Sequence, residues 1–421
     1  MNFIEELEWR GMLHDMTPGA KEAIESGMQT AYIGFDPTAP SLTIGNYVQL
    51  MVLSFWQKSG NKPIVLMGGA TGRIGDPSGK SEERQLKSYE ELDNNLAHQV
   101  TQMKKFLDFE SGDNKAELRN NLDFYKEMNV LDFLRDVGKT LTVSYMMSKD
   151  SVKNRLESGL SFTEFSYQLL QAYDFQYLYE QDQCKFQMGG SDQWGNITSG
   201  TEFIRRNLDD AKPYAITSKL LTKADGKKFG KSEKGNIWLD PKKTSPYEFY
   251  QFWLKASNDD LPTYLKYFSF KSRAEIENLI AQAEENPQAV TATLAEELTT
   301  RVHSAEAFEA AKNVSQVIFN KKLDNASLRE MNTATLEMVS QEIPSYQIGN
   351  SENSLDKLLS QECSIFSSVS EFRRAIKGNA LAVNKIKITD HEATIQPSDY
   401  IHGKYLMVEN GKRNKYLLVK A

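Results

Sequence analysis

The amino-acid sequence predicts an α/β protein, with a parallel sheet first, a helical region next and a small α+β unit last. Three apolar segments end in glycine, at 30–34, 63–69 and 185–190, and helical patterns such as 47–59 lie between them. Strands that alternate with helices indicate a parallel α/β sheet. From Ser245 to about Asn320 the pattern becomes helical and rich in Ala, Glu and Leu, which predicts a helical second part.

The glycine ends of the three apolar segments predict a ligand site. The middle segment is continuously apolar up to its glycines, as expected for a strand buried on both faces. Parallel sheets bind their ligands beyond the carboxyl ends of the strands, which is where all these glycines fall. Glycine at such a position lets a ligand approach the backbone closely.

Length, charge and cysteine usage narrow the class of protein. With 421 residues the chain is too long for one ordinary core, so two or three domains are expected. The net charge of -7 argues against a protein that coats nucleic acid over its whole surface, but it allows local basic patches. Cys184 and Cys363 have no metal-ligand spacing and indicate a reducing compartment. The N-terminal residues 1–8 are acidic, and no apolar run approaches the roughly 18 residues that span a bilayer, so we expect a cytoplasmic protein without a membrane contact.

The stretch 34–46 is typical of a strand end, a tight turn and the start of a helix. Exposed N–H groups and the helix dipole suit a phosphate group. Gly45 permits adenine to pack against the helix start, and Thr38 has a hydroxyl for a pyrophosphate oxygen. A plain strand-to-helix turn would use the same residue types, because Asp, Pro, Thr and Ser favour turns in any case.

The glycine-rich loop 68–81 ends like a Walker A loop but does not match that motif, because position 74 is Ile where glycine is needed. It does not match the dinucleotide-binding fingerprint either. Asp76 is a candidate for an amino-acid ammonium group, and Lys80 and Arg84 are candidates for phosphate. A flexible loop with solvated charges is the alternative.

The segment that begins at Ser161 predicts a helix with a polar stripe. Ser161 to Glu164 matches a capping box, and Tyr167, Gln171 and Asp174 then share one helix face. This stripe is either a solvated surface or the wall of a phenol-binding site, in which Asp174 accepts a hydrogen bond from a substrate hydroxyl. Such a site rejects an analogue that lacks the hydroxyl by roughly 10⁴ to 10⁵.

The segment 189–196 places Asp192 and Gln193 just past the third strand. Asp192 is able to accept a hydrogen bond from a ribose hydroxyl, and Gln193 is able to contact the carboxyl region of a substrate. Without the other segments, this would be an ordinary polar loop.

The segment 223–232 is rich in lysine and contains two glycines. A charged surface loop is the default interpretation. The functional alternative is a mobile loop that closes over pyrophosphate, because flexible lysines suit charge that develops only in the transition state.

In combination these segments resemble the tyrosyl-tRNA synthetases, strongly over residues 1–320 and weakly beyond. The motifs that carry the resemblance occur in order: Tyr32, Gly34, Asp36, Thr38, Gly45, the Gly-Asp-Pro-Ser-Gly-Lys loop at 75–80, the helix at 161–175, Gly-Gly-Ser-Asp-Gln-Trp-Gly-Asn at 189–196, Lys-Phe-Gly-Lys-Ser at 228–232 and the segment 242–253.

The resemblance implies a role for each candidate residue. The residues implied to bind tyrosine are Tyr32 and Asp174 at its hydroxyl, Asp76, Tyr167 and Gln171 at its ammonium group, and Gln193 near its carboxylate. The residues implied to bind ATP are Gly34, Asp36, Gly45, Gly190 and Asp192. The residues implied to be catalytic are Thr38, Thr43, Asn46, Lys80, Arg84, Lys228, Lys231 and Ser232.

The reaction implied by the resemblance is tyrosine–tRNA ligation by a homodimer. The carboxylate of L-tyrosine attacks the α-phosphorus of ATP, which carries Mg²⁺, and pyrophosphate leaves. The tyrosyl group then passes to the terminal ribose of tRNA(Tyr). A carboxylate is already a nucleophile, so catalysis depends on positioning and on stabilising the phosphate in the transition state. No tightly bound cofactor and no protein-bound metal are expected.

The resemblance also implies the domains. They are a Rossmann-like catalytic domain at 1–235, a helical domain that binds the anticodon arm at 236–325, a linker at 326–354 and an S4-like RNA-binding domain at 355–421. In residues 361–421, ten Lys and Arg exceed six Asp and Glu by four, which supplies a basic surface for phosphate contacts. A solvated basic surface is the alternative. The RNA-binding candidates are Arg373, Arg374, Lys377, Lys412 and Arg413.

The sequence departs from the family pattern at Thr43, where the family usually has His, and none of the five His residues lies in this segment. A threonine hydroxyl has a shorter reach, so our hypothesis is a slower or differently supported activation step. Asn46 is an accepted family variant. Ile33 and Gln49 replace a common Cys and a small residue, so ribose contacts from these two side chains are not carried over.

Other functions have to be weighed against this one. The departure at Thr43 motivates the alternative of a catalytically weakened paralogue with an RNA-binding or other adenylating role. Tyr32 together with Asp174 disfavours a tryptophan-activating relative, because an indole offers only a donor and a larger ring. A purely structural RNA-binding protein would leave the ammonium-binding cluster without a purpose.

Overall fold

The chain folds into two compact units. The computed structural model describes residues 2–78, 85–149, 152–153, 155, 159–232, 235–320, 322–349, 354–411 and 414–420. The first unit comprises residues 1–245 and 252–302, and the second comprises 246–251 and 303–421. In the described part of the chain, no helix is long and apolar enough to cross a membrane.

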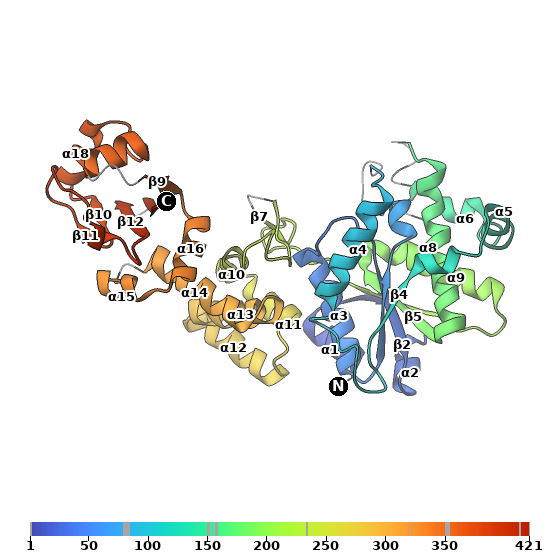
Figure 1. Ribbon diagram of the computed structural model, residues 1–421. Helices are drawn as coiled ribbons and strands as arrows, with labels where there is room; N and C mark the ends of the chain where they lie inside the picture. Colours follow the sequence, from blue (N-terminus) through green and yellow to red (C-terminus); the bar gives the residue numbers. More distant parts are fainter. Residues whose placement is uncertain are drawn as a thin grey trace. The chain divides into compact units, whose positions relative to one another are not determined.

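A six-stranded sheet with the order β1-β6-β5-β2-β3-β4 forms the centre of the first unit (Figure 1). Its strands are β1 (Leu13–Met16), β2 (Thr30–Phe35), β3 (Lys62–Met67), β4 (Glu117–Asn120), β5 (Cys184–Gly190) and β6 (Tyr214–Ser218). Neighbouring strands are parallel except for β1, which pairs antiparallel with β6. The predicted parallel α/β sheet is therefore confirmed, with one antiparallel edge strand that the sequence analysis did not predict.

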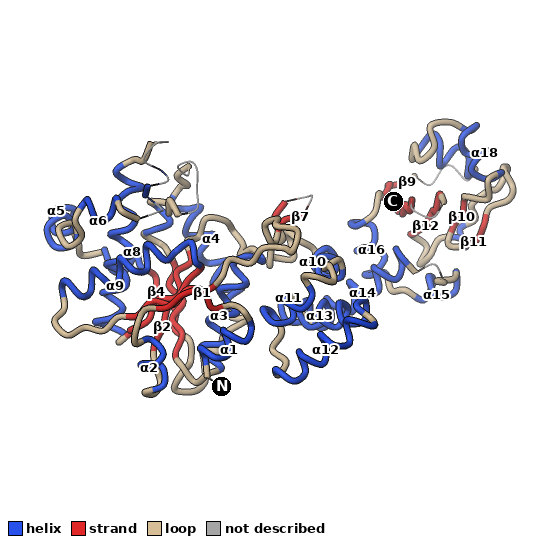
Figure 2. Tube along the Cα trace, turned by 180° about the vertical axis from the view of Figure 1, so that it is seen from behind, coloured by secondary structure: helices blue, strands red, loops and turns tan. Residues whose placement is uncertain are grey.

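Helices cover this sheet on both faces, and Figure 2 shows the strands between α3 on one side and α8 and α9 on the other. The helices of this part are α1 (Phe3–Arg10), α2 (Ala20–Glu25), α3 (Ile44–Lys58), α4 (Tyr89–Met103), α5 (Val130–Asp132), α6 (Val143–Met147), α8 (Phe162–Asp182) and α9 (Trp194–Asn207). Shorter turns of helix are η1 (Thr71–Arg73), η2 (Asn121–Tyr125), η3 (Phe133–Val137) and η4 (Ser191–Gln193). With both faces covered, the sheet buries continuous apolar strands such as β3.

The predicted helical region from Ser245 to Asn320 is confirmed. It contains α10 (Pro246–Leu254), α11 (Leu261–Phe268), α12 (Arg273–Glu285), α13 (Pro287–Val302) and α14 (Ala305–Phe319). Helices α11 to α13 belong to the first unit, whereas α14 belongs to the second. A two-stranded hairpin, β7 (Lys231–Ser232) with β8 (Gly235–Asn236), precedes them.

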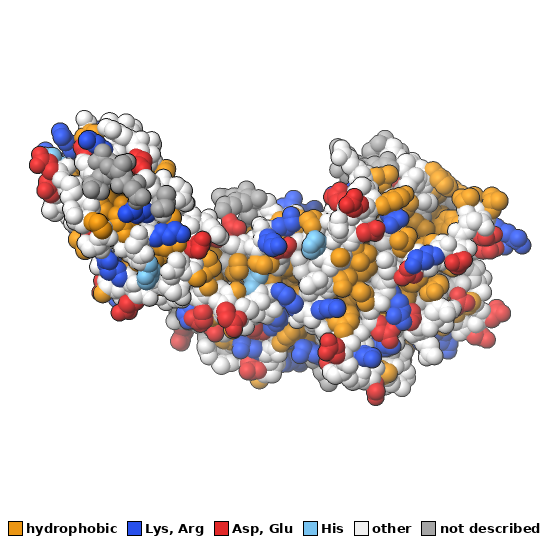
Figure 3. Space-filling view, in the orientation of Figure 1, with side chains coloured by type: hydrophobic (Ala, Val, Ile, Leu, Met, Phe, Trp, Pro, Cys, Tyr) orange, Lys and Arg blue, Asp and Glu red, His pale blue; other side chains and the backbone are white. Residues whose placement is uncertain are grey.

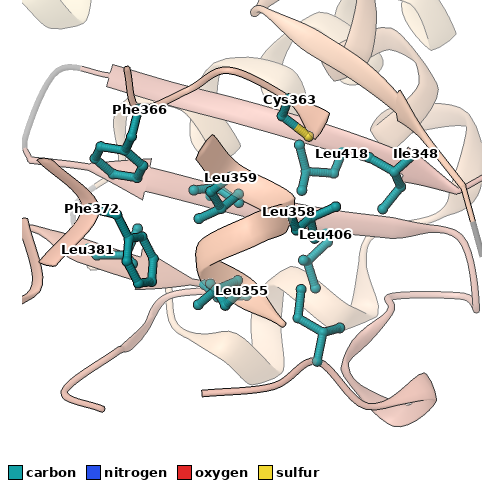
Figure 4. Close-up of a cluster of buried hydrophobic side chains, with 13 residues drawn as sticks. Ile348, Leu355, Leu358, Leu359, Cys363, Phe366, Phe372, Leu381, Leu406 and Leu418 are labelled. Carbon is teal, nitrogen blue, oxygen red and sulfur yellow. The ribbon is translucent and has the colours of Figure 1, made fainter. Parts of the chain in front are cut away.

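The second unit contains a five-stranded sheet with the order β11-β10-β12-β13-β9. Its strands are β9 (Ser345–Ile348), β10 (Leu381–Val383), β11 (Ile386–Lys387), β12 (Tyr405–Asn410) and β13 (Asn414–Lys420), and its helices are α14, α15 (Asn325–Glu330), α16 (Thr333–Glu342), α17 (Leu355–Lys357), η5 (Leu358–Glu362) and α18 (Val369–Lys377). Figure 4 shows its apolar core, in which Leu406 and Leu418 of the sheet lie close to Leu358 of the helix that faces them. The last strand, β13, completes the α+β unit that was predicted at the end of the chain.

The interval 326–354, expected as a linker, differs from that expectation in its described part. It contains α16 and the strand β9, which pairs in parallel with β13. Ile348 is buried in the core of the unit and Tyr346 packs against that core, so two alternate apolar side chains are enough to hold a short edge strand in a polar segment. The predicted domain limits at 235, 325 and 354 remain predictions.

Candidate active site

A cavity of about 460 Å³ opens at the carboxyl ends of β2 and β5. The strand order reverses between these two neighbours, and α/β sheets bind ligands at such a reversal. The predicted site residues that line the cavity are Tyr32, Gly34, Asp36, Thr38, Gly45, Asn46, Asp76, Tyr167, Gln171, Asp174, Gly190, Asp192, Gln193 and Lys228. Segments far apart in the sequence therefore meet at one cavity.

The carboxylate of Asp174 is buried at the base of the cavity and is held by two donors. The Tyr125 hydroxyl donates to Oδ1 at 2.7 Å, and Nδ2 of Asn121 donates to Oδ2 at 2.8 Å. Burial raises the pKa of Asp174 to about 7, while these two hydrogen bonds act in the opposite direction. Asp174 is thus a titratable acceptor near neutral pH, with further lone pairs for a ligand.

Tyr32 lies on β2 and presents an unused hydroxyl to the cavity. The side chain is buried, and its hydroxyl oxygen has no hydrogen-bond partner among the described residues. The ring makes an edge contact with Phe175 at 5.5 Å between centroids. Leaving a buried hydroxyl unpaired costs about 1–3 kcal/mol, so this hydroxyl is available to a polar ligand atom.

A second acid, Asp36, is linked to Asp174 through a chain of hydrogen bonds. The hydroxyls of Thr71 and Tyr167 donate to its two carboxylate oxygens, at 2.6 and 2.8 Å. Nδ2 of Asn121 lies 3.0 Å from Oγ1 of Thr71 as well as bonding Asp174. The two acids therefore belong to one buried polar network, which fixes the shape of the cavity floor.

Asp76 forms the opposite wall of the cavity with a cluster of amides. Nε2 of Gln193 donates to Oδ2 at 2.8 Å, and the backbone N–H of Ser78 donates to Oδ1 at 2.9 Å. Nδ2 of Asn196 lies 3.3 Å from Oδ1 and 3.0 Å from the Ser78 hydroxyl. This arrangement brings one carboxylate and a neutral amide next to each other at the cavity edge.

Gly34 keeps space in the cavity rather than in the protein core. It is exposed within a central strand, and a Cβ built on it would meet no atom within 4 Å. A Cβ on Gly68, by contrast, would overlap the carboxylate of Asp36. The protein requires glycine at 68 for its own packing, whereas the packing of the described residues does not require it at 34.

On the ATP-binding role that the resemblance implies for Gly34, Gly34→Val is expected to leave the free energy of unfolding nearly unchanged and to raise KM for ATP at least about tenfold, because the side chain would fill space that the ligand needs. Gly68→Ala is the contrasting variant and should lower Tm. Urea unfolding and initial rates at varied ATP concentration distinguish the two. An unchanged KM for ATP in a folded Gly34→Val protein would contradict this prediction.

The lysine-rich loop is anchored to the start of α3. Lys228 is exposed and lines the cavity, whereas Lys231 is exposed in β7 and does not line it. Gly230 has φ +82°, and a Cβ there would lie 2.5 Å from Cγ2 of Ile44. The N–H of Ile44 donates to the carbonyl of Ile237 at 2.9 Å, which closes the base of the loop.

Phe229 adds to this anchor, because its ring stacks on Phe268 with 5.5 Å between centroids. Three predicted phosphate or catalytic groups cannot be placed: Lys80, Arg84 and the side chain of Ser232 lie outside the described residues.

Thr43 is the N-cap of α3 and does not line the cavity. Its hydroxyl donates to Oδ1 of Asn46 at 2.8 Å, and its backbone N–H donates to the same oxygen at 2.9 Å. Its hydroxyl oxygen also lies 3.4 Å from the N–H of Asn46. In the structure, Thr43 therefore holds Asn46, and an N-cap threonine of this kind contributes about 1 kcal/mol to stability.

Of the predicted RNA-binding residues, Arg373, Arg374 and Lys377 are exposed on α18. The buried Phe372 anchors the opposite side of this helix. Lys412 and Arg413 lie outside the described residues.

The sequence analysis missed Asn121, Tyr125 and Thr71, which support the two acids. Asn121 and Tyr125 belong to no motif with a characteristic spacing and come from a short helical turn after β4, whereas Thr71 lies in the glycine-rich loop 68–81 but was not singled out there. Asn121 follows the carboxyl end of β4, but the sequence does not mark that strand, so this position gave no usable signal. No group of three or more His, Cys, Asp or Glu able to hold a metal ion occurs among the residues that were placed.

Two families match the chain. Residues 26–320 match the family described as tRNA synthetases class I (W and Y). Residues 335–419 match the tyrosine–tRNA ligase SYY-like C-terminal domain.

Full-length relatives and solved structures agree with these matches. The tyrosine–tRNA ligase of Bacteroides fragilis is 49% identical over 431 residues, covering 100% of both chains. That of Cytophaga hutchinsonii is 50% identical over 425 residues, covering 99% of both. A C-terminally truncated mitochondrial tyrosyl-tRNA synthetase of Aspergillus nidulans is 31% identical with a TM-score of 0.67, and the match covers 76% of this chain and 94% of that one.

Proposed function

Since this chain belongs to the tyrosine–tRNA ligases, which are class I tRNA synthetases, we propose that the cavity binds L-tyrosine with its phenol between Asp174 and Tyr32. The enzyme activates L-tyrosine with ATP to tyrosyl-adenylate and transfers the tyrosyl group to the 3′ end of tRNA(Tyr). One observation carries the proposed orientation: a buried carboxylate and an unpartnered buried hydroxyl border the same end of the cavity. A phenol satisfies both, because it donates one hydrogen bond and accepts another.

The binding groups for the ammonium and carboxylate end of tyrosine are assigned from their charge. Asp76 supplies the carboxylate for the substrate ammonium group, with Tyr167 and Gln171 of α8 beside it on the cavity wall. The amide of Gln193, which already contacts Asp76, is the donor proposed for the substrate carboxylate. The polar groups would thus fix both ends of the amino acid, and the carboxylate would point toward ATP.

ATP is proposed to lie over the glycines of the strand ends. Gly34, Gly45 and Gly190 line the cavity and are proposed to face the adenosine part, and Asp192 is proposed to accept a hydrogen bond from a ribose hydroxyl. Asp36 remains assigned to the ATP side, although its two carboxylate oxygens already accept from Thr71 and Tyr167.

The phosphates are proposed to meet donors from the start of α3 and from the lysine loops. The proposed donors are Thr38, Asn46, Lys80, Arg84, Lys228, Lys231 and Ser232. The observation in favour of this set is that Lys228, Thr38 and Asn46 line the same cavity. Thr43 is proposed to act through Asn46, which it holds in place.

In the proposed activation step, the tyrosine carboxylate attacks the α-phosphorus in line with the departing pyrophosphate. No general base is needed, so this chain's residues contribute alignment and positive charge. Mg²⁺ is proposed to arrive with ATP as part of the substrate, since this ion is usually held through substrate phosphates.

Tyrosine-dependent ATP–pyrophosphate exchange, with phenylalanine and tryptophan as controls, tests this assignment. Exchange with tyrosine alone is the expected result, because only a phenol satisfies Asp174 and Tyr32 together. Exchange with phenylalanine at a rate comparable to that with tyrosine would contradict the proposed phenol site. The comparisons give no support to the alternative of a weakened paralogue.

We also propose that the enzyme is a cytoplasmic homodimer. Apolar side chains gather over α5 and α6 in Figure 3, and single proteins seldom expose large apolar patches without a partner. The exposed apolar residues of this region are Val130, Leu131, Leu134, Val143, Met147 and Phe162. A second copy of the chain is the proposed cover, and sedimentation analysis would test it.

The exposed basic face of α18 is proposed to bind phosphates of tRNA(Tyr). Its candidates are Arg373, Arg374 and Lys377, together with Lys412 and Arg413 of the predicted S4-like domain.

A further inference from the structure

Tyr125 supports Asp174 from behind and does not line the cavity. Resting on the proposed role of Asp174 at the substrate hydroxyl, we propose that Tyr125 is a positioning residue that holds the Asp174 carboxylate in a fixed orientation and thereby sets the preference for tyrosine over phenylalanine. Tyr125 would act on specificity without touching the substrate.

The geometry gives each carboxylate oxygen of Asp174 one donor. Tyr125 bonds Oδ1 at 2.7 Å and Asn121 bonds Oδ2 at 2.8 Å. Asn121 is itself held, because its Oδ1 accepts from the N–H of Ala70 at 2.7 Å. An ionised carboxylate accepts about four hydrogen bonds, so lone pairs remain for the cavity side. With both donors in place, the carboxylate plane is fixed before the substrate enters.

Tyr125 is well placed to exert this control. It ends the short helix η2, and its ring packs against Tyr173 with 5.5 Å between centroids and against Phe133 with 6.4 Å. Its hydroxyl also lies 3.0 Å from the carbonyl of Leu170. A phenol has one proton to donate, and a carboxylate is the stronger acceptor of the two.

The hydrogen bond from Tyr125 affects the protonation of Asp174 as well as its orientation. Burial raises the pKa of Asp174, Asp36 raises it further, and the hydrogen bonds from Asn121 and Tyr125 lower it. The ionisable groups that face Asp174 are Asp36, Tyr32, Tyr125, Tyr167 and Tyr173, as far as the chain is described. Loss of the Tyr125 hydroxyl removes a lowering contribution, so Asp174 would hold its proton to higher pH and would accept the substrate hydroxyl less often.

The test measures tyrosine-dependent pyrophosphate exchange across pH for the wild type, Tyr125→Phe, Tyr173→Phe and Asp174→Asn. Tyr125→Phe removes one hydroxyl and keeps the ring. We expect kcat/KM for tyrosine to fall about tenfold at neutral pH, the size of one hydrogen bond to a charged group. The acid limb of its pH profile should move to higher pH, while kcat and kcat/KM for phenylalanine stay close to the wild type. Tyr173→Phe deletes a hydroxyl from the same aromatic cluster and should keep the wild-type limb.

Each outcome separates this inference from the proposed role of Asp174. If Tyr125→Phe kept the acid limb and the tyrosine preference of the wild type while Asp174→Asn changed both, the inference about Tyr125 would be overturned. The proposed role of Asp174 would stand. If Asp174→Asn itself kept the acid limb and the tyrosine preference of the wild type, both the inference about Tyr125 and the proposed role of Asp174 would be overturned. Equal effects of Tyr125→Phe and Tyr173→Phe would also overturn it, because they would point to the packing of the cluster rather than to the hydrogen bond.

Discussion

Asp174→Ala is expected to reduce the preference for tyrosine over phenylalanine, measured as the ratio of their kcat/KM values, from about 10⁴–10⁵ to about 10 or less. The substrate hydroxyl would lose its buried acceptor, so the change in the ratio would come almost entirely from a lower kcat/KM for tyrosine. Phenylalanine makes no bond to Asp174, so its kcat/KM should change little. Pyrophosphate exchange with each amino acid measures both values.

The alanine variant also removes the carboxylate acceptor shared by Asn121 and Tyr125, which keep only the Thr71 hydroxyl and the Leu170 carbonyl as acceptors, so some loss of stability is expected. Partial unfolding would lower both kcat/KM values by the same factor, so their ratio still reports the specificity of the folded enzyme. Asp174→Asn serves as a second variant that keeps the shape and removes the charge. A ratio unchanged in both variants would rule out Asp174 as the phenol acceptor.

Lys228→Ala is expected to lower kcat for tyrosine activation by about 10²–10³, the usual effect of removing one group that stabilises transition-state charge. KM for tyrosine should change little, because Lys228 lies on the side of the cavity assigned to ATP. Its ammonium group is exposed and would be recruited as pyrophosphate forms. Pre-steady-state formation of the adenylate measures this step directly.

The neighbouring lysine provides a matched control. Lys227 is also exposed, lies 3.0 Å from Asp225 as an ion pair and does not line the cavity. Lys227→Ala removes the same charge one residue away and should retain nearly full activity. Similar losses in the two variants would mean that only the net charge of the loop matters, contrary to the prediction.

The sequence predicted the centre of the sheet better than its edges. Strands β2, β3 and β5 are apolar runs that end in or next to glycine, and all three were found where they were expected. The edge strand β4 (Glu-Leu-Arg-Asn) has a single apolar residue, so no alternation marks it as a strand. Only its pairing with β3 makes it one.

The site shows the same division. The helix from Ser161 could be predicted because its cap and its polar stripe are local patterns, and the N-cap bond from Glu164 N–H to Ser161 is present at 3.1 Å. Tyr125 could not be predicted in this way, because its bond to Asp174 joins residues 49 positions apart. Contacts of this kind depend on how η2 and α8 pack, and sequence spacing carries no record of that packing.

The buried chain of hydrogen bonds at the cavity floor has a consequence for redesign. An enzyme engineered to accept an amino acid with an apolar para substituent could not be obtained by changing Asp174 alone, because the amide of Asn121 and the hydroxyls of Tyr125 and Tyr32 would remain as polar groups around the new apolar group. Such a library should vary these four positions together, with apolar residues of matched volume. Single-site libraries would leave polar groups against the apolar substituent and weaken its binding, and pairs that leave one donor behind should fail for the same reason.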